Sequence, residues 1–153
     1  MKTSFAVTLA AALALGSAAS AETFTGVFKN DPATLLTAPG PTPAATQLGA
    51  YWKGTSTSTS KSGVVTTSTY TCVGWSTPNA ATDTAAVCEG ADNATDKYAI
   101  NLVCAANDPK DPSKGAMCWG ALIGTGGKYA GKHGNFAQFS SVSSGTNEGA
   151  WSD

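Results

Sequence analysis

Four cysteines, Cys72, Cys88, Cys104 and Cys118, are the residues whose chemistry is most narrowly limited by their number and spacing. Zinc sites usually contain a close C-x₂₋₄-C pair, and the separations here are much wider. An even number of cysteines behind a secretory signal is typical of disulfides. The cysteines are therefore expected to form two disulfides rather than a metal site or a free catalytic thiol.

The positions of the cysteines also favour one pairing. Cys72 with Cys88, and Cys104 with Cys118, are each symmetric about a stretch rich in turn formers. Residues symmetric about the turn of an antiparallel hairpin lie about 4.5–5.5 Å apart, within reach of a disulfide. Pairing Cys72 with Cys104 skips a strand, a span of about 9.5 Å. Pairing Cys88 with Cys104 forces Cys72 to reach Cys118 across three strand spacings. We predict Cys72–Cys88 and Cys104–Cys118.

Aromatic side chains are the second set with possible chemistry. The chain has four tryptophans and four tyrosines. If these rings line the interior of a barrel, they suit an apolar or planar ligand; if they fill it, they are only core. Both alternatives stay open. The candidate ligand-binding residues are Trp52, Tyr70, Tyr98 and Trp119.

The sequence offers few residues for other kinds of catalytic site. His133 is the only histidine and lies in a turn, and no G-x-S-x-G elbow is present. Glu89 and Glu148 are among the few acids available to a glycosidase or an isomerase. The acidic stretch 89–96 does not match a calcium-binding loop. No catalytic residue, metal or cofactor is assigned.

Charge and the N-terminus limit the partners and the compartment. The chain has no arginine and a net charge of −1, which argues against nucleic-acid binding. Lys2, the apolar run 5–15 and the small residues 19–21 predict a signal peptide over residues 1–21. No other run is long enough to span a bilayer as a helix. We expect a secreted or periplasmic protein with no transmembrane segment in the mature chain, residues 22–153.

The mature chain is expected to be all-β. Thr, Ser and aromatic residues are frequent, whereas Leu and Glu are scarce, which favours strands over helices. Short alternating runs are separated by turn formers and by a Pro-rich loop at 38–43. Eight such strands usually form a barrel or a sandwich, and closure removes exposed edges. We predict a single antiparallel β-barrel with strands at about 24–29, 48–60, 64–75, 85–89, 98–106, 116–125, 135–143 and 146–151.

A glycine-rich segment near residue 130 predicts a structural corner between two strands. Gly126 and Gly127 permit a tight reversal, Tyr129 can pack on the barrel end, and Gly131 and Gly134 let the chain re-enter a strand. A phosphate-binding loop would need these glycines to open a helix after a strand.

This segment, G-T-G-G-K-Y-A-G-K-H-G over 124–134, resembles a stretch of small exported bacterial β-barrels, G-T-G-K-Y-A-G-x-x-G. Residues 70–74 and 88–97 look like the C-x-G, C and D-K motifs of the same proteins. Their barrel is similar to that of plant allene oxide cyclase and dirigent proteins. The resemblance covers about 48–153, departs from the pattern at Gly126-Gly127 and at Cys118-Trp119, and carries over no catalytic residue.

The function expected from these observations is a non-enzymatic module. It would bind a small apolar molecule or take part in interactions at the cell envelope. The alternative is an isomerase or cyclase of the allene oxide cyclase type acting on an apolar small molecule. An open interior with a buried acid would favour the alternative, and an interior packed shut would exclude both ligand binding and cyclisation. The oligomeric state is not predicted.

Overall fold

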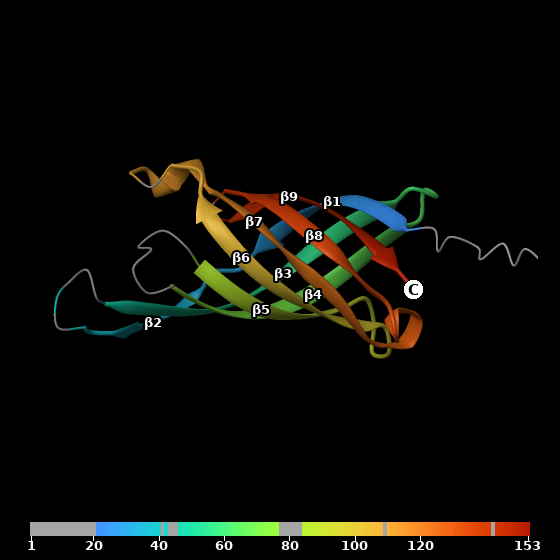
Figure 1. Cartoon of the computed structure of the whole chain (residues 1–153), viewed down its shortest axis with the longest axis horizontal. Coiled ribbons are helices and arrows are strands. Elements are labelled where there is room, and N and C mark those ends of the chain that lie inside the picture. The colour runs from blue at the N-terminus through green and yellow to red at the C-terminus, as the bar shows by residue number, and fades with distance from the viewer. Residues whose placement is uncertain (1–20, 41, 43–45, 77–83, 109, 142) are drawn as a thin grey trace, which may run out of the picture.

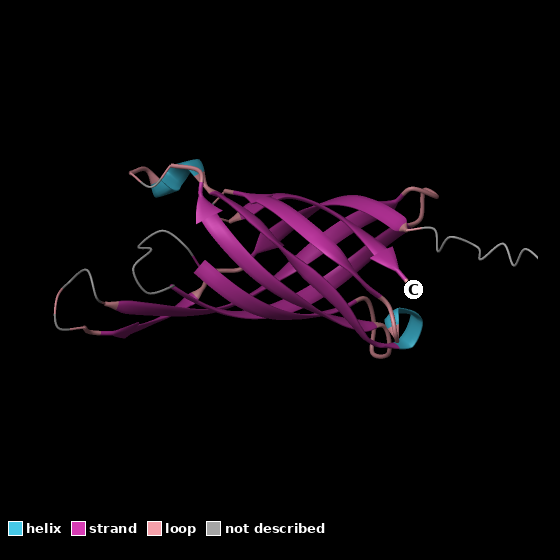
Figure 2. Ribbon diagram, viewed as in Figure 1, coloured by secondary structure: helices cyan, strands magenta, loops and turns pink. Residues whose placement is uncertain are grey.

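The protein folds as a closed antiparallel β-barrel of eight strands with one further strand outside the wall (Figures 1 and 2). The computed structural model describes residues 21–40, 42, 46–76, 84–108, 110–141 and 143–153. The predicted fold class is confirmed. The strands are β1 (Glu22–Asn30), β2 (Thr34–Ala38), β3 (Gln47–Ser60), β4 (Val65–Ser76), β5 (Thr84–Ala91), β6 (Lys97–Ala106), β7 (Ala116–Gly126), β8 (His133–Ser140) and β9 (Ser144–Ser152).

The wall of the barrel follows the order β1-β9-β8-β7-β6-β5-β4-β3 and closes where β3 pairs with β1. Two short 3₁₀ turns interrupt the connections, η2 (Pro112–Lys114) before β7 and η3 (Gly127–Tyr129) before β8. Within the described residues, no helix has the length and the apolar character needed to cross a membrane. The predicted signal peptide falls almost wholly in residues 1–20, outside the described part of the chain.

The strand β2 was not predicted. Strand β3 is 14 residues long, and its second half, Gly54–Ser60, pairs with β1. Residues 47–51 of β3 extend past the end of β1 and pair with β2 instead, at the left of Figure 1. Adjacent Leu35 and Leu36 break the alternation that identifies a half-buried strand, and both are exposed. Ala38, which the sequence places in a Pro-rich loop over 38–43, is the last residue of β2; positions 41 and 43 lie outside the described residues.

The T-S-T-S-T-S run of β3 forms a strand paired with β4, as predicted, rather than a linker. Ser56, Ser58 and Ser60 face the barrel interior, whereas the threonines between them face outward. Successive side chains of a strand point to opposite faces. The repeat therefore gives one wall of the interior small hydroxyl groups.

Large rings inside the barrel pack against inward-facing glycines on neighbouring strands. A Cβ atom at any of these glycines would collide with the ring beside it. Small barrels often alternate large and small residues in this way to fill their taper. The pairs are Phe24 with Gly149, Phe28 with Gly145, Trp52 with Gly74, Tyr70 with Gly54, and Tyr98 with Gly90.

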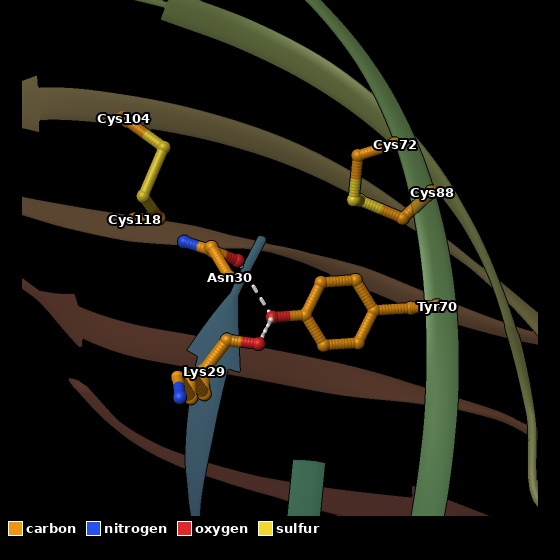
Figure 3. Close-up of a disulfide and its surroundings, with 7 residues drawn as sticks. All are labelled: Lys29, Asn30, Tyr70, Cys72, Cys88, Cys104 and Cys118. Carbon is orange, nitrogen blue, oxygen red and sulfur yellow. Dashed lines mark hydrogen bonds between the residues drawn. A yellow bond between two sulfur atoms is a disulfide. The ribbon is translucent and has the colours of Figure 1, made fainter. Parts of the chain in front are cut away.

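Both predicted disulfides are present, Cys72–Cys88 between β4 and β5 and Cys104–Cys118 between β6 and β7. The paired cysteines are direct cross-strand neighbours, with Cα atoms 4.0 Å apart in each case. Figure 3 shows both bridges with the ring of Tyr70 near them. Three of the four cysteines belong to the buried core, together with Ile100 and Leu122 among others.

Candidate functional site

The interior of the barrel contains a cavity of about 320 Å³ to which all eight wall strands contribute. It reaches the barrel end at which β3 turns into β4 and β7 turns into β8, the right-hand end in Figure 1. We call this end the mouth and define it by Glu22, Ser60, Val64, Lys128 and Lys132, which line the cavity there. Glu22, Val64 and Lys128 are exposed to solvent, so the cavity opens through the mouth.

Most of the cavity surface is apolar. Aromatic rings come from β1, β3, β4, β6, β8, β9 and η3, and aliphatic side chains come from β6, β7 and the β3–β4 turn. An apolar pocket with a few placed polar groups is the usual form of a small-molecule site. The aromatic wall consists of Phe24, Phe28, Trp52, Tyr98, Phe136 and Trp151.

Four polar side chains of the cavity belong to one row of paired residues across five strands. In the registers of β8, β9, β1, β3 and β4, Gln138 lies opposite Asn147, Asn147 opposite Gly26, Gly26 opposite Ser58, and Ser58 opposite Thr66. Gly26 has no side chain, and the other four residues all line the cavity. We call this row, Gln138-Asn147-Gly26-Ser58-Thr66, the polar belt.

A buried carboxylate organises the loops at the mouth. Asp92 follows β5 and its side chain is 5% exposed. Ser68 donates a hydrogen bond to one of its oxygens at 2.6 Å. Tyr129 donates to the other at 2.7 Å, and Lys128 Nζ forms an ion pair with that oxygen at 2.7 Å. A buried charge needs such partners. The carboxylate therefore acts as a clamp that joins β4, the β5–β6 turn and η3.

The tyrosines of the interior remain protonated. Burial raises the pKa of the Tyr129 phenol, and its hydrogen bond to Asp92 and the negative charge of Asp92 raise it further. Burial likewise raises the pKa values of Tyr70 and Tyr98. Tyr70 donates to Asn30 Oδ1 at 2.6 Å and lies 3.2 Å from the Lys29 carbonyl oxygen (Figure 3). The phenols of Tyr70 and Tyr129 are therefore fixed hydrogen-bond donors rather than bases.

Three of the four candidate ligand-binding residues, Trp52, Tyr70 and Tyr98, line the cavity. Trp119 does not: its side chain is 47% exposed on the outer face of β7. The expectation that it lines the interior is wrong because Cys118 points inward, so its neighbour along the strand points outward.

Several cavity residues were not singled out from the sequence. They are Phe24, Phe28 and Phe136 of the aromatic wall, and the polar residues Gln138 and Asn147. Once a cysteine pair is taken to face inward, every second residue along the same strand is expected to face the interior as well, and this rule identifies the cavity positions. Gln138, for example, lies opposite Cys118 and faces the same side.

The predicted corner residues extend from the last residue of β7, through η3, to the second residue of β8. Gly127 and Gly131 have φ angles of 56° and 81°, which favour glycine, whereas Gly126 is extended. A Cβ at Gly134 would collide with the carbonyl oxygen of residue 150 on β9. The Tyr129 ring packs 4.7 Å from that of Trp151 and 5.3 Å from that of Tyr98, between centroids.

Other residues considered for catalysis or metal binding lie elsewhere. Glu89 and Glu148 are exposed on the outer face, and His133 is the exposed first residue of β8. In the 89–96 stretch, Asp96 accepts hydrogen bonds from the Lys128 backbone N–H and from Asn93 Nδ2, which lower the pKa of Asp96. Across the described residues, no three His, Cys, Asp or Glu side chains gather where they could hold a metal ion.

No known protein family, curated protein or solved structure matches this chain. The resemblance to exported bacterial barrels and to allene oxide cyclase therefore stays a prediction, and function has to be argued from the cavity itself.

Proposed function

We propose that this protein is a binding module that holds a small, largely apolar or planar ligand inside its barrel. The observation that carries the proposal is the cavity of about 320 Å³, lined by aromatic rings and open at the mouth. Ligand pockets typically measure about 300–1,000 Å³, so the cavity suits a molecule with two or three fused or linked rings.

The residues inside the barrel explain why space remains there. On the β5–β7 side the interior is filled by packed side chains such as Ile100, Leu102 and Leu122. On the opposite side β1 and β3 present Gly26, Ser56 and Ser58, which are too small to fill the gap. These small residues alternate with the rings of Phe24, Phe28 and Trp52 on the same two strands, and the space they leave suits a small ligand.

The same proposal includes export. Disulfides form and persist in oxidising compartments, and two are present. With the N-terminal pattern of residues 1–21, they support a protein that is secreted or periplasmic. The isomerase or cyclase alternative has no comparable support, because Glu22, at the exposed mouth, is the one carboxylate among the described residues that line the cavity.

Fluorescence titration with N-phenyl-1-naphthylamine, a neutral aromatic dye that brightens in apolar surroundings, tests the proposal. We expect saturable binding of one dye per barrel. Ser58→Phe places a ring in the cavity and should weaken binding at least tenfold. Thr57→Phe adds the same ring to the outer face of β3 and should leave binding unchanged.

Circular dichroism of both variants must match that of the parent protein, so that loss of binding reports a blocked cavity. Equal binding by the Ser58→Phe and Thr57→Phe variants would place the dye outside the barrel. That result, or the absence of saturable binding to the parent protein, would contradict the proposed function.

A further inference from the structure

Two hydroxyl groups lie side by side on the cavity wall just inside the mouth. Ser58 of β3 and Thr66 of β4 are paired in the antiparallel register, and both side chains line the cavity. Directly opposite residues on one face of such a pair have Cβ atoms about 4.5–5.5 Å apart. The two hydroxyls can therefore contact the same polar group of a bound molecule.

The neighbouring hydroxyls of this wall are engaged within the protein, whereas these two are not. Ser56 hydrogen-bonds a carbonyl oxygen of β1 at 3.3 Å, Ser68 donates to Asp92 at 2.6 Å, and both serines are buried. Ser58 and Thr66 are half-buried, and within the described residues neither hydroxyl has a hydrogen-bond partner. A hydroxyl donates one hydrogen bond and accepts two, so this pair can serve a ligand donor or a ligand acceptor.

The small residue beside the pair keeps it uncovered. In the polar belt, Ser58 lies between Thr66 on one side and Gly26 on the other. A Cβ atom at Gly26 would lie 2.7 Å from Ser58 Oγ. Glycine at this position therefore leaves the Ser58 hydroxyl open toward the cavity, where any larger residue would crowd it.

The charged groups of the cavity are confined to the mouth. Among the described residues that line the cavity, the charged ones are Glu22, Lys128 and Lys132. Lys128 forms an ion pair with Asp92 at 2.7 Å, and Lys132 forms one with Asp153 at 3.5 Å. Burying an ionised group without an opposite charge is costly. The hydroxyl pair, which carries no charge, therefore suits a neutral polar group.

We propose that the ligand carries a neutral oxygen group, a hydroxyl or a carbonyl, that hydrogen-bonds to Ser58 and Thr66 while its apolar body lies deeper, against the aromatic wall. The inference, which rests on the proposed function, narrows the ligand class to flat or apolar alcohols, phenols and ketones. It also orients the ligand with its polar end toward the mouth. Hydrocarbons cannot pair with the two hydroxyls, and carboxylates would bring an uncompensated charge.

Two probes of nearly equal shape isolate this contact, because 2-naphthol has a hydroxyl where 2-methylnaphthalene has a methyl group. Displacement of N-phenyl-1-naphthylamine measures both affinities, once the affinity of each variant for the dye is known. Ser58→Ala and Thr66→Val should each weaken 2-naphthol binding about five- to tenfold, the effect of one lost hydrogen bond. Both should leave 2-methylnaphthalene binding within about twofold. Thr67→Val, the same change on the outer face of β4, should alter neither affinity.

A measurement on the unmodified protein locates the polar end of the probe. Nuclear Overhauser effects should connect the ring protons beside the 2-naphthol hydroxyl to the methyl group of Thr66. Gln138 tests the alternative position, because it lies on the opposite wall, four strands away in the ring of eight. Loss of 2-naphthol affinity in Gln138→Met, but in neither Ser58→Ala nor Thr66→Val, would overturn the inference.

The remaining outcomes separate the inference from the proposed function. Unchanged 2-naphthol binding in both Ser58→Ala and Thr66→Val, or an equal loss for the two probes, would overturn the inference and leave the proposed function standing. Failure of 2-naphthol to displace bound dye from the parent protein would do the same. Absence of saturable binding by the dye and by both probes would overturn the two together.

Discussion

At the residue scale, the interior separates its polar groups into two kinds. Asp92 and Tyr70 are saturated by partners and serve to hold strands and loops together. Asn147 donates to Ser56 Oγ, and within the described residues its Oδ1 atom is buried without a hydrogen bond. Paired buried groups stabilise a fold, whereas an unpaired one costs about 1–3 kcal/mol. The paired groups are therefore the ones expected to hold the strands and the loops at the mouth in place.

The raised pKa values of Tyr70, Tyr98 and Tyr129 predict alkaline unfolding. An unfolded tyrosine loses its proton near pH 10, and the folded protein retains these three protons to higher pH. Because the unfolded state then binds fewer protons, the free energy of unfolding should be constant at neutral pH and fall as the pH rises above about 10. Phenolate absorbance and circular dichroism followed together should show ionisation coinciding with loss of structure.

Tyr70→Phe is the control for this prediction. It should destabilise the barrel by about 1 kcal/mol at neutral pH, through loss of the bond to Asn30, and reduce the steepness of the alkaline decline. Reversible titration of the phenols of Tyr70 and Tyr129 near pH 10, in a barrel that stays folded, would show that these rings are not buried as described.

The candidate site was only partly predictable at this scale. Trp52, Tyr70 and Tyr98 were identified from residue type, and Trp119 was identified on the same ground but points outward. Residue type cannot say which face of a strand a ring occupies; the neighbouring inward cysteine can. The buried position of Asn147 carries no signal in the sequence, because it involves Ser56, which is distant along the chain.

At the element scale, the barrel depends on rings packed against glycines in adjacent strands. Gly74→Ala should destabilise the protein by about 1–3 kcal/mol, since its Cβ would lie 2.9 Å from the Trp52 ring. Gly49→Ala is the matched change one strand away: its nearest contact is Leu36 Cβ at 3.7 Å, and we expect an effect within about 0.5 kcal/mol. Urea unfolding measures both. Equal effects of the two substitutions would contradict the packing described.

The strands and their pairing were largely predictable, because turn formers and alternation mark each hairpin. Both disulfides followed from symmetry about the turns, which holds when consecutive strands are neighbours, as they are from β3 to β9. Strand β2 could not be predicted, since it owes its existence to the edge of β3 that β1 leaves free rather than to its own pattern. Residue pattern alone does not reveal that β3 is longer than the barrel wall needs.

At the scale of the whole molecule, closure separates an inner surface from an outer one. The four tryptophans divide evenly: Trp52 and Trp151 line the cavity, whereas Trp75 and Trp119 are exposed outside. An eight-stranded barrel is just wide enough to hold one small ligand, so whether this interior is used could not be decided without the side-chain positions. The cavity opening at the mouth makes binding inside the barrel the central claim.

The indole N–H resonances of the four tryptophans test that claim most directly. Each is assigned by a single Trp→Phe variant and followed during titration with N-phenyl-1-naphthylamine. We predict that the resonances of Trp52 and Trp151 shift saturably with one dye per barrel while those of Trp75 and Trp119 do not move. Shifts confined to Trp75 and Trp119 would place the interaction on the outer surface and contradict a ligand-binding interior.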